Sequence, residues 1–351
     1  MGAAEELIEE IELNHLVPLN SLNPDSLNEL ISQSTIKRLP PGRHLFDQGD
    51  TDNVTVYLLS GQLALVTDGE TAITIKAGTN DALNPIANQQ PRTATALART
   101  CVTTLNIDTH LLNKFFSCDD DVPDKDPIDN DNTSREERIK QMMEIPLLSG
   151  LPSPYKKVLI HRFEEIQAHE GEVIIQRGNE SNYYYLITQG RCSVTEIADH
   201  PDLTTKHTEL VAGCGFGEEA LITSSPYKYT VTMLEKGRLL ALSRGEFMTL
   251  LVRPLIKHLS YQQVVKMDQE RISLLDLRTR GAFYKSHLKG SINFPFSVLK
   301  DAVSILDRDR EYIVCGDSHQ RSIVAAFFLL KQGLDAKILN QGIRKILTSL
   351  S

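Results

Sequence analysis

Short runs of alternating apolar and polar residues, separated by glycines, dominate the first two thirds of the chain. Residues 55–59 and 183–187 are two of these runs, and this alternation predicts half-buried β-strands. Glycine supplies the positive φ that tight turns between strands require. The pattern therefore predicts a β-rich architecture in this region.

This β-rich pattern occurs twice. Residues 41–65 (PGRHLFDQGDTDNVTVYLLSGQLAL) correspond to residues 170–194 (EGEVIIQRGNESNYYYLITQGRCSV) at a constant offset of 129. The positions that coincide are Gly42, Gly49, Asn53 and Gly61 with Gly171, Gly178, Asn182 and Gly190. Because three glycines keep one spacing, we predict two copies of one β-rich domain.

The last third of the chain has a different rhythm. Residues 255–272 predict a helix that leads out of the second β-rich copy, and no helix-turn-helix pattern follows it. Strands are then predicted at 273–277, 312–315 and 336–339, with a helix at 322–330. Strands that alternate with helices indicate a small α/β domain with a parallel sheet.

An acidic segment separates the two β-rich copies. Residues 119–138 contain seven Asp and two Glu against two Arg and one Lys. This segment accounts for most of the net charge of −9, and its composition predicts a disordered linker. The expected domains are residues 11–118, 139–258 and 259–351, with the linker at 119–138.

Composition and charge narrow the class of protein. No apolar run approaches the ~20 residues that span a bilayer, and the acidic N-terminus does not resemble a signal peptide. The five cysteines form no C-x-x-C pair and the ten histidines are scattered. We therefore expect a cytoplasmic protein without structural disulfides, a metal site or a membrane span. The acidic balance also argues against a nucleic-acid partner.

The second β-rich copy contains Phe216-Gly217-Glu218-Glu219-Ala220-Leu221, followed by Ser225-Pro226. It resembles the cyclic-nucleotide-binding domain of catabolite-activator-type regulators and cyclic-nucleotide-dependent kinases. This resemblance implies a β-jelly roll flanked by helices, with a cassette of the form F-G-E-x-A-L followed by P-R-x-A-T. In that family, backbone N–H groups and an Arg bind the cyclic phosphate, and the Glu binds the ribose 2′-hydroxyl. The candidate ligands are cyclic AMP and cyclic GMP.

Neither copy has the complete set of ligand-binding residues. In the second copy Gly217, Glu218 and Ala220 match, but Tyr227 stands where the family has Arg, and Lys228 follows it. A lysine cannot form the planar fork of an arginine.

In the first copy Pro91-Arg92-Thr93 matches the arginine half, and counting back from the proline puts Leu83 where Glu is needed. Losing one partner of a buried charged hydrogen bond costs about 2–5 kcal/mol, or about a 30- to 4000-fold loss of affinity. Three interpretations stay open: weak cyclic-nucleotide binding by the second copy, another planar ligand stacked on Tyr227 and Tyr229, or jelly rolls kept for packing and protein contacts.

The segment 274–296 (LLDLRTRGAFYKSHLKGSINFPF) resembles the rhodanese domain. Its matching residues are Asp276, Arg278, Phe283, His287, Gly290, Ser291, Asn293 and Pro295. The resemblance implies a small α/β fold, supported by Asp276 and Arg278. It also implies sulfur transfer through a cysteine that opens a loop of the form C-x-x-G-x-R-S.

The corresponding loop, Cys315 to Ser322 (CGDSHQRS), departs from that form. Arg321 and Ser322 match its end, but the family's spacing puts Gly316 at the position of the nucleophile. Cys315 lies one residue earlier, where a strand would point it to the opposite face. We favour an inactive loop with Cys315 as a buried strand residue. The alternatives are a sulfurtransferase that uses Cys315 in a shifted loop with Arg321, and phosphatase-type chemistry from C-x5-R.

These observations predict two jelly rolls and one rhodanese-like domain. We expect a cytoplasmic regulatory or sensor protein that binds a small ligand or a protein partner. A cyclic-nucleotide-regulated sulfurtransferase is one alternative, and a transcription regulator is another that the missing DNA-binding helices disfavour. By analogy with the jelly-roll family, a helix near 255–268 is a candidate homodimer interface.

Overall fold

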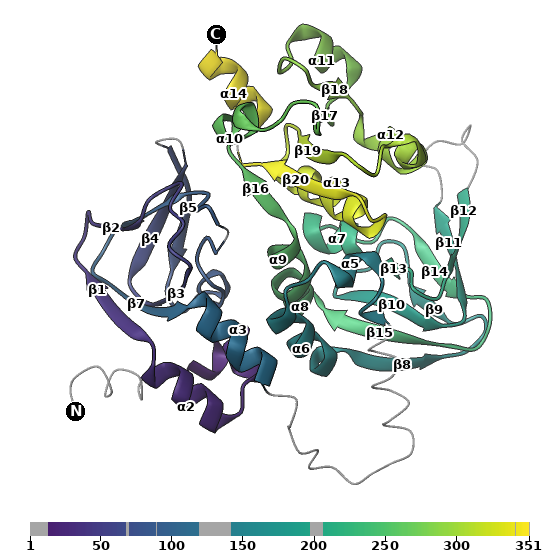
Figure 1. Cartoon of the computed structure of the whole chain (residues 1–351). Coiled ribbons are helices and arrows are strands. Elements are labelled where there is room, and N and C mark those ends of the chain that lie inside the picture. The colour runs from purple at the N-terminus through teal and green to yellow at the C-terminus, as the bar shows by residue number, and fades with distance from the viewer. Residues whose placement is uncertain are drawn as a thin grey trace.

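The structure is a computed structural model that describes residues 13–67, 70–88, 90–118, 142–196, 206–340 and 342–350. The chain forms three domains: domain 1 (residues 13–118), domain 2 (142–255) and domain 3 (257–350) (Figure 1). The predicted linker at 119–138 lies outside the described residues.

Domain 1 is a sandwich of two antiparallel sheets. One sheet has the order β1 (Thr35–Leu39), β7 (Val102–Asp108), β3 (Val54–Ser60). The other has the order β2 (His44–Phe46), β6 (Thr95–Ala98), β4 (Gln62–Thr67), β5 (Glu70–Lys76). The flanking helices are α2 (Pro24–Ser32) and α3 (Thr109–Cys118), and they pack with the N-terminal turns over the outer face of β3 and β7.

Domain 2 repeats this sandwich. One sheet has the order β13 (Gly215–Phe216), β10 (Tyr183–Gln189), β15 (Gly237–Ser243), β8 (Glu164–Ala168). The second has the order β12 (Lys206–Val211), β11 (Arg191–Glu196), β14 (Thr230–Met233), β9 (Val173–Ile175). The surrounding helices are α5 (Pro146–Ser149), α6 (Ser153–Arg162), α7 (Glu218–Thr223), α8 (Arg244–Glu246), the π-helical turn Phe247–Val252 and α9 (Arg253–Leu255).

The predicted repeat is present in the hydrogen bonds of the two sandwiches. The N–H of Gly49 donates to the carbonyl of Arg92 at 2.8 Å, and the N–H of Gly178 donates to the carbonyl of Tyr227 at 2.8 Å. Arg92 and Tyr227 are therefore structural counterparts, 135 residues apart, whereas the glycines are 129 apart. Six additional residues therefore lie between these positions in domain 2.

Domain 3 has a five-stranded sheet in which every neighbouring pair is parallel. Its order is β16 (Lys257–Leu259), β20 (Asp335–Leu339), β19 (Glu311–Cys315), β17 (Ile272–Asp276), β18 (Ile292–Asn293). Its helices are α10 (Tyr261–Lys266), α11 (Arg280–Lys285), α12 (Phe296–Ala302), α13 (His319–Lys331) and α14 (Ile343–Leu350). The predicted strands 273–277, 312–315 and 336–339 and the helix 322–330 are confirmed within three residues at each end.

The single helix predicted at 255–272 is wrong. Helix α9 ends at Leu255, and residues 257–259 form strand β16 at the edge of the parallel sheet. Ser260 then begins α10 with a capping box, in which its hydroxyl accepts from the N–H of Gln263 and the Gln263 side chain accepts from the Ser260 N–H. Because a strand interrupts the helix, the proposed dimer helix near 255–268 does not exist as one element.

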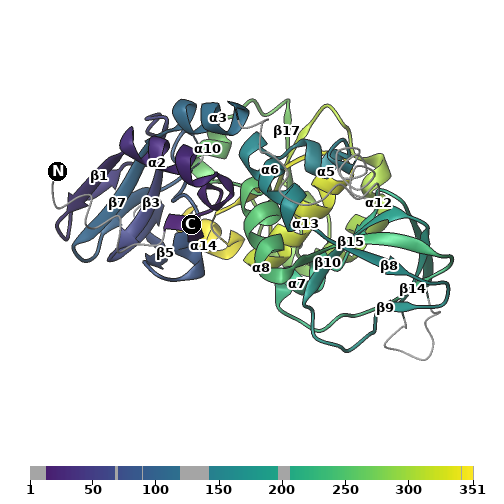
Figure 2. The same cartoon turned by 90° about the horizontal axis from the view of Figure 1, so that it is seen from below.

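Domains 2 and 3 share one hydrophobic core. It runs from α5, α6 and the π-helical turn of domain 2 to α13 and the strands of domain 3. Phe327 of α13 packs edge-on against Phe247 and Tyr184, with ring centroids 5.4 and 6.4 Å away. Helix α13 lies against α7, and domain 1 lies to one side of the domain 2–domain 3 pair (Figures 1 and 2).

Candidate functional site

The cassette of domain 2 is built around Gly217. Its φ of 102° lies in the left-handed region, and a Cβ at this position would lie 2.8 Å from the carbonyl oxygen of Tyr183. Only glycine fits here without displacing the backbone. This turn leads from β13 directly into α7, so Glu218 is the first residue of the helix.

Glu218 is held by a lysine from domain 3. The Lys331 ammonium lies 2.5 Å from Glu218 Oε1 and also donates to the carbonyl oxygen of Gly215 at 2.7 Å. The side chains of Lys331 and Glu218 are only 17% and 15% exposed, so water screens this ion pair weakly. Within the described part of the chain, Glu218 Oε2 has no hydrogen-bond partner.

Tyr227 fills the position that Arg92 occupies in domain 1. Its side chain is buried, and its hydroxyl donates to the carbonyl oxygen of Tyr183 at 2.8 Å. Burial raises the pKa of Tyr227, so the hydroxyl stays neutral. The N–H of Gly217, at the start of the cassette, donates to the hydroxyl of Tyr229 at 2.9 Å. The position where the family carries its arginine therefore has no charge in domain 2.

The remaining candidates of domain 2, Lys228 and Ala220, have other contacts than Glu218. The Lys228 side chain is 67% exposed and its ammonium lies 2.9 Å from Glu219 Oε1. Ala220 is buried in the apolar core of the sandwich. Sequence reasoning offered Lys228 as a replacement cation for the missing arginine, but in this structure the lysine pairs with Glu219.

Arg92 of domain 1 is fully buried, and both of its terminal guanidinium nitrogens have partners within its own domain. One guanidinium nitrogen donates to Asp52 at 2.7 Å and to the carbonyl of Val54, and the other donates to the carbonyl of Ala87 at 3.1 Å. The guanidinium carbon lies 4.1 Å from the centre of the Phe46 ring. Arg92 is therefore a structural residue here, and Thr93 follows it half-buried in the turn before β6.

In the described part of domain 1, no helix corresponds to α7. The N–H of Ile86 donates to the carbonyl of Val56 at 2.7 Å, at the place where Phe216 pairs with Tyr185 in domain 2. Ala87 follows with a positive φ of 39°, as Gly217 does in domain 2. By this correspondence Asn88, and not Leu83, takes the position of Glu218, so counting back from Pro91 was wrong because the two loops differ in length.

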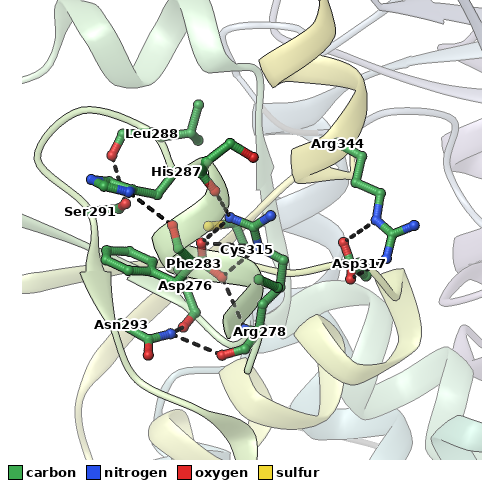
Figure 3. Close-up of polar contacts among 12 residues, drawn as sticks. Asp276, Arg278, Phe283, His287, Leu288, Ser291, Asn293, Cys315, Asp317 and Arg344 are labelled. Carbon is green, nitrogen blue, oxygen red and sulfur yellow. Dashed lines mark hydrogen bonds and ion pairs between the residues drawn. The ribbon is translucent and has the colours of Figure 1, made fainter. Parts of the chain in front are cut away.

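The centre of domain 3 is a buried ion pair. The Nε of Arg278 lies 3.0 and 3.1 Å from the two carboxylate oxygens of Asp276, and its Nη2 lies 2.7 Å from Oδ2. Arg278 also donates to the carbonyl of Ser286, and the Asn293 amide donates to the carbonyls of Asp276 and Arg278 (Figure 3). These contacts fix the segment 276–293 against the end of β17.

Cys315 points away from the loop that follows it. Its side chain is 1% exposed, and its thiol donates to the carbonyl oxygen of Leu275 on the neighbouring strand at 3.4 Å. Burial, with a smaller effect of Asp276, raises the pKa of the Cys315 thiol far above its usual range. A thiol in this environment is not a nucleophile at neutral pH.

Gly316 occupies the position of the family's nucleophile, and its surroundings are compact. A Cβ on Gly316 would lie 3.6 Å from both Leu277 Cβ and Ser322 Oγ, which are ordinary contacts. The next residue, Asp317, forms a two-pronged ion pair with Arg344 at 2.9 Å (Figure 3). Arg321 is exposed on the first turn of α13.

Family models match all three domains. The model described as "Cyclic nucleotide-binding domain" matches residues 36–119 and 165–253, and the model described as "Rhodanese-like domain" matches residues 261–349. The chain therefore carries two cyclic nucleotide-binding domains followed by a rhodanese-like domain. The predicted fold classes of all three domains are confirmed.

The curated relatives of this chain are cyclic-nucleotide-dependent kinases and their regulatory subunits. The cAMP-dependent protein kinase regulatory subunit of Yarrowia lipolytica is 23% identical over 75% of this chain and 65% of the relative. The corresponding subunit of Dictyostelium discoideum is 33% identical over 26% of this chain and 29% of the relative. The mouse cGMP-dependent protein kinase 2 is 23% identical over 58% of this chain and 26% of the relative. The chain thus spans about a quarter to two thirds of the length of these relatives.

Solved structures include the regulatory subunit of a cAMP-independent protein kinase A from Trypanosoma cruzi bound to guanosine. It is 18% identical, with a TM-score of 0.36 over 72% of this chain and 87% of that one. The cAMP-bound PfPKA-R structure is also 18% identical, with a TM-score of 0.38 over 72% and 85%.

Sequence reasoning missed Lys331. It lies 113 residues from Glu218, on a helix of the rhodanese-like domain whose apolar pattern predicts only core packing. No local motif signals a contact between two domains of different families. Among the described residues there is no cluster of three His, Cys, Asp or Glu side chains placed to hold a metal. Within the same residues, every helix is too short or too polar to cross a bilayer.

Proposed function

We propose that this chain is a regulatory protein in which the second cyclic nucleotide-binding domain receives a cyclic nucleotide through Glu218. In this proposal the rhodanese-like domain is non-catalytic, and its contacts with the second domain depend on whether the nucleotide site is occupied. The observation that carries the proposal is the ion pair between Glu218 and Lys331, because it joins the cassette's ribose-binding carboxylate to the neighbouring domain. The names of the curated relatives, which are cyclic-nucleotide-dependent kinases and their regulatory subunits, support the same class of ligand.

The Arg92 position of the first domain and the Cys315 loop of the third suggest different roles for these two domains. Arg92 of the first domain is engaged by Asp52 and by backbone carbonyls, so we propose that the first domain is structural. The thiol of Cys315 is buried and donates to Leu275, so we propose that the rhodanese-like domain is not a sulfurtransferase. We also propose a cytoplasmic location, since the described cysteines Cys101, Cys192, Cys214 and Cys315 are free thiols.

The proposal is tested by calorimetric titration of cyclic AMP and cyclic GMP into the full chain. We expect binding that is weaker than that of a complete cassette, by about 30- to 4000-fold, because Tyr227 replaces the phosphate-binding arginine. Glu218→Gln removes the charged acceptor for the ribose hydroxyls and should abolish the measured binding.

Glu235→Gln is the control, because Glu235 lies outside the cassette and pairs with Arg191, with both side chains exposed. It should leave the affinity within about twofold of the wild type, since exposed ion pairs contribute at most about 1 kcal/mol. Absence of binding by the wild-type chain at millimolar nucleotide, or equal binding by Glu218→Gln, would contradict the proposed function.

A further inference from the structure

We infer that Lys331 is a built-in competitor for the ligand site of the second cyclic nucleotide-binding domain. The inference rests on the proposed function, since it assigns Glu218 to the ligand. In the structure the Lys331 ammonium takes the position next to Glu218 Oε1 that a ribose hydroxyl would need. Docking of α13 on the cassette and binding of a ligand at Glu218 therefore oppose each other.

Among the described residues, the Lys331 ammonium bonds only to the two sides of the Gly217 turn. Lys331 donates to Glu218 and to the carbonyl of Gly215, so it bridges the two sides of the Gly217 turn. It is the last residue of α13, and the preceding turns of that helix carry Val324, Phe327 and Phe328 toward domain 2. The apolar residues hold α13 in place, and the lysine is the polar end of this interface.

A small cleft borders Glu218 beside the ion pair. It is lined by Glu218, Glu219 and Tyr229 of the cyclic nucleotide-binding domain and by Phe296, Val324 and Phe328 of the rhodanese-like domain. Lysine has a flexible four-carbon stem with a single charged end, so its ammonium can leave Glu218 by rotation of the side chain. A ligand that enters by this cleft needs the lysine to move, and it thereby removes the polar contacts that hold the end of α13 on the cassette.

Displacement of Lys331 carries a cost that the ligand must overcome. The ammonium and the carboxylate are both largely buried, and separating such a pair leaves one charge without its partner. By linkage, the factor by which docked Lys331 weakens ligand binding equals the factor by which the ligand weakens docking. The rhodanese-like domain thus senses the ligand through the end of α13, without a catalytic loop.

The test compares the wild-type chain with Lys331→Met, which keeps the apolar stem and removes the charge. Titration with cyclic AMP and cyclic GMP should show about 5- to 150-fold tighter binding to the variant, the usual range of coupling between sites. Without ligand, hydrogen exchange in residues 319–331 should be faster in the variant than in the wild type. Lys228→Met is the control, since its ammonium pairs with Glu219 and should change neither measurement.

A charge-swapped chain, Glu218→Lys with Lys331→Glu, separates the two claims. It restores the ion pair in reverse but not the hydrogen bond to the Gly215 carbonyl, so part of the slow exchange of residues 319–331 should return while nucleotide binding is lost. If Lys331→Met binds nucleotide no more tightly than a wild type that does bind it, the competition is refuted and the proposed function stands. If neither chain binds nucleotide, the proposed function falls and the competition with it, and unchanged exchange in Lys331→Met would refute the docking role independently.

Discussion

Arg92 and Tyr227 occupy the same position in the two sandwiches, but their side chains make different contacts. Both backbones make the same hydrogen bond to a glycine N–H, yet the arginine is bound by Asp52 and the tyrosine by the carbonyl of Tyr183. The terminal nitrogens of the arginine and the hydroxyl of the tyrosine each bond inside their own domain. The identity of the residue at this position is therefore explained by internal contacts, without a phosphate.

Replacement of Arg92 tests this internal role. Arg92→Met should lower the free energy of unfolding of domain 1 by about 3 kcal/mol, because it leaves Asp52 without its buried partner. Arg43→Met is the control, since Arg43 is exposed and surface changes usually stay within about 0.5 kcal/mol. Denaturant unfolding of the full chain measures both, and an Arg92 variant as stable as the Arg43 variant would refute the structural role.

At the scale of elements, strand β19 decides the chemistry of the third domain. Cys315 is its last residue and faces an apolar cluster, while Gly316 begins the loop that leads to α13. A one-residue difference in register separates a buried thiol from a loop nucleophile, because side chains alternate along a strand. Comparison of residues 315–322 with the form C-x-x-G-x-R-S predicted that Cys315 lies one residue before the position of the nucleophile. The structure places its thiol on the buried side of the strand.

Mutation can place a thiol at position 316, where the family has its nucleophile. We expect no thiosulfate–cyanide sulfurtransferase activity from the wild type and no change in Cys315→Ser. Gly316→Cys should introduce a thiol that is alkylated at least about tenfold faster than Cys315, since it lies in the loop before a helix N-terminus. Mass spectrometry of the alkylated peptides measures this ratio. Turnover by the wild type that is lost in Cys315→Ser would overturn the account of this loop.

Strand β16 brings a histidine close to the start of α13. The rings of His258 and His319 have centroids 5.5 Å apart. Desolvation, and then the proximity of His319, lowers the pKa of His258 to about 4, although a hydrogen bond with Asn340 acts in the opposite direction. His258 is therefore neutral in the folded protein at neutral pH.

Protonation of His258 at acid pH should lower the free energy of unfolding of domain 3. Because the unfolded histidine titrates near pH 6.5 and the folded one near 4, stability is complete above pH 6.5 and falls as the pH drops toward 4. His258→Gln should flatten the loss of stability in this window by up to about 3 kcal/mol. Unfolding measured from pH 7 to 4 checks this, and identical slopes for both chains would show that His258 does not titrate in this way.

Local sequence patterns predicted most elements but not the contacts between them. The constant glycine spacing predicted both sandwiches, and the β/α alternation of residues 273–339 predicted the parallel sheet. Both patterns can be read locally, because they depend on residues that are near one another in the sequence. Strand β16 was missed because three residues are too short for a periodic pattern and the strand forms by pairing with β20, about 80 residues later. The placement of Leu83 failed for a related reason, since the length of a loop is fixed by strand pairing.

At the scale of the molecule, two ion pairs join neighbouring domains. Asp81, in the short turn Asn80–Leu83 of the first domain, lies 2.5 Å from Arg253 of α9, and Glu218 lies 2.5 Å from Lys331 of α13. The second contact is the more buried of the two, and it lies at the shared core of domains 2 and 3. Domain 1 is thus joined to domain 2 by a half-exposed ion pair, and domain 2 to domain 3 by a largely buried one.

The measurement that tests this account most directly is hydrogen exchange of residues 319–331 in the wild-type chain, with and without saturating cyclic nucleotide. The account predicts faster exchange toward the end of α13 when nucleotide is bound, because the ligand takes Glu218 from Lys331. Unchanged or slower exchange in α13, with nucleotide shown by calorimetry to occupy the site, would contradict it.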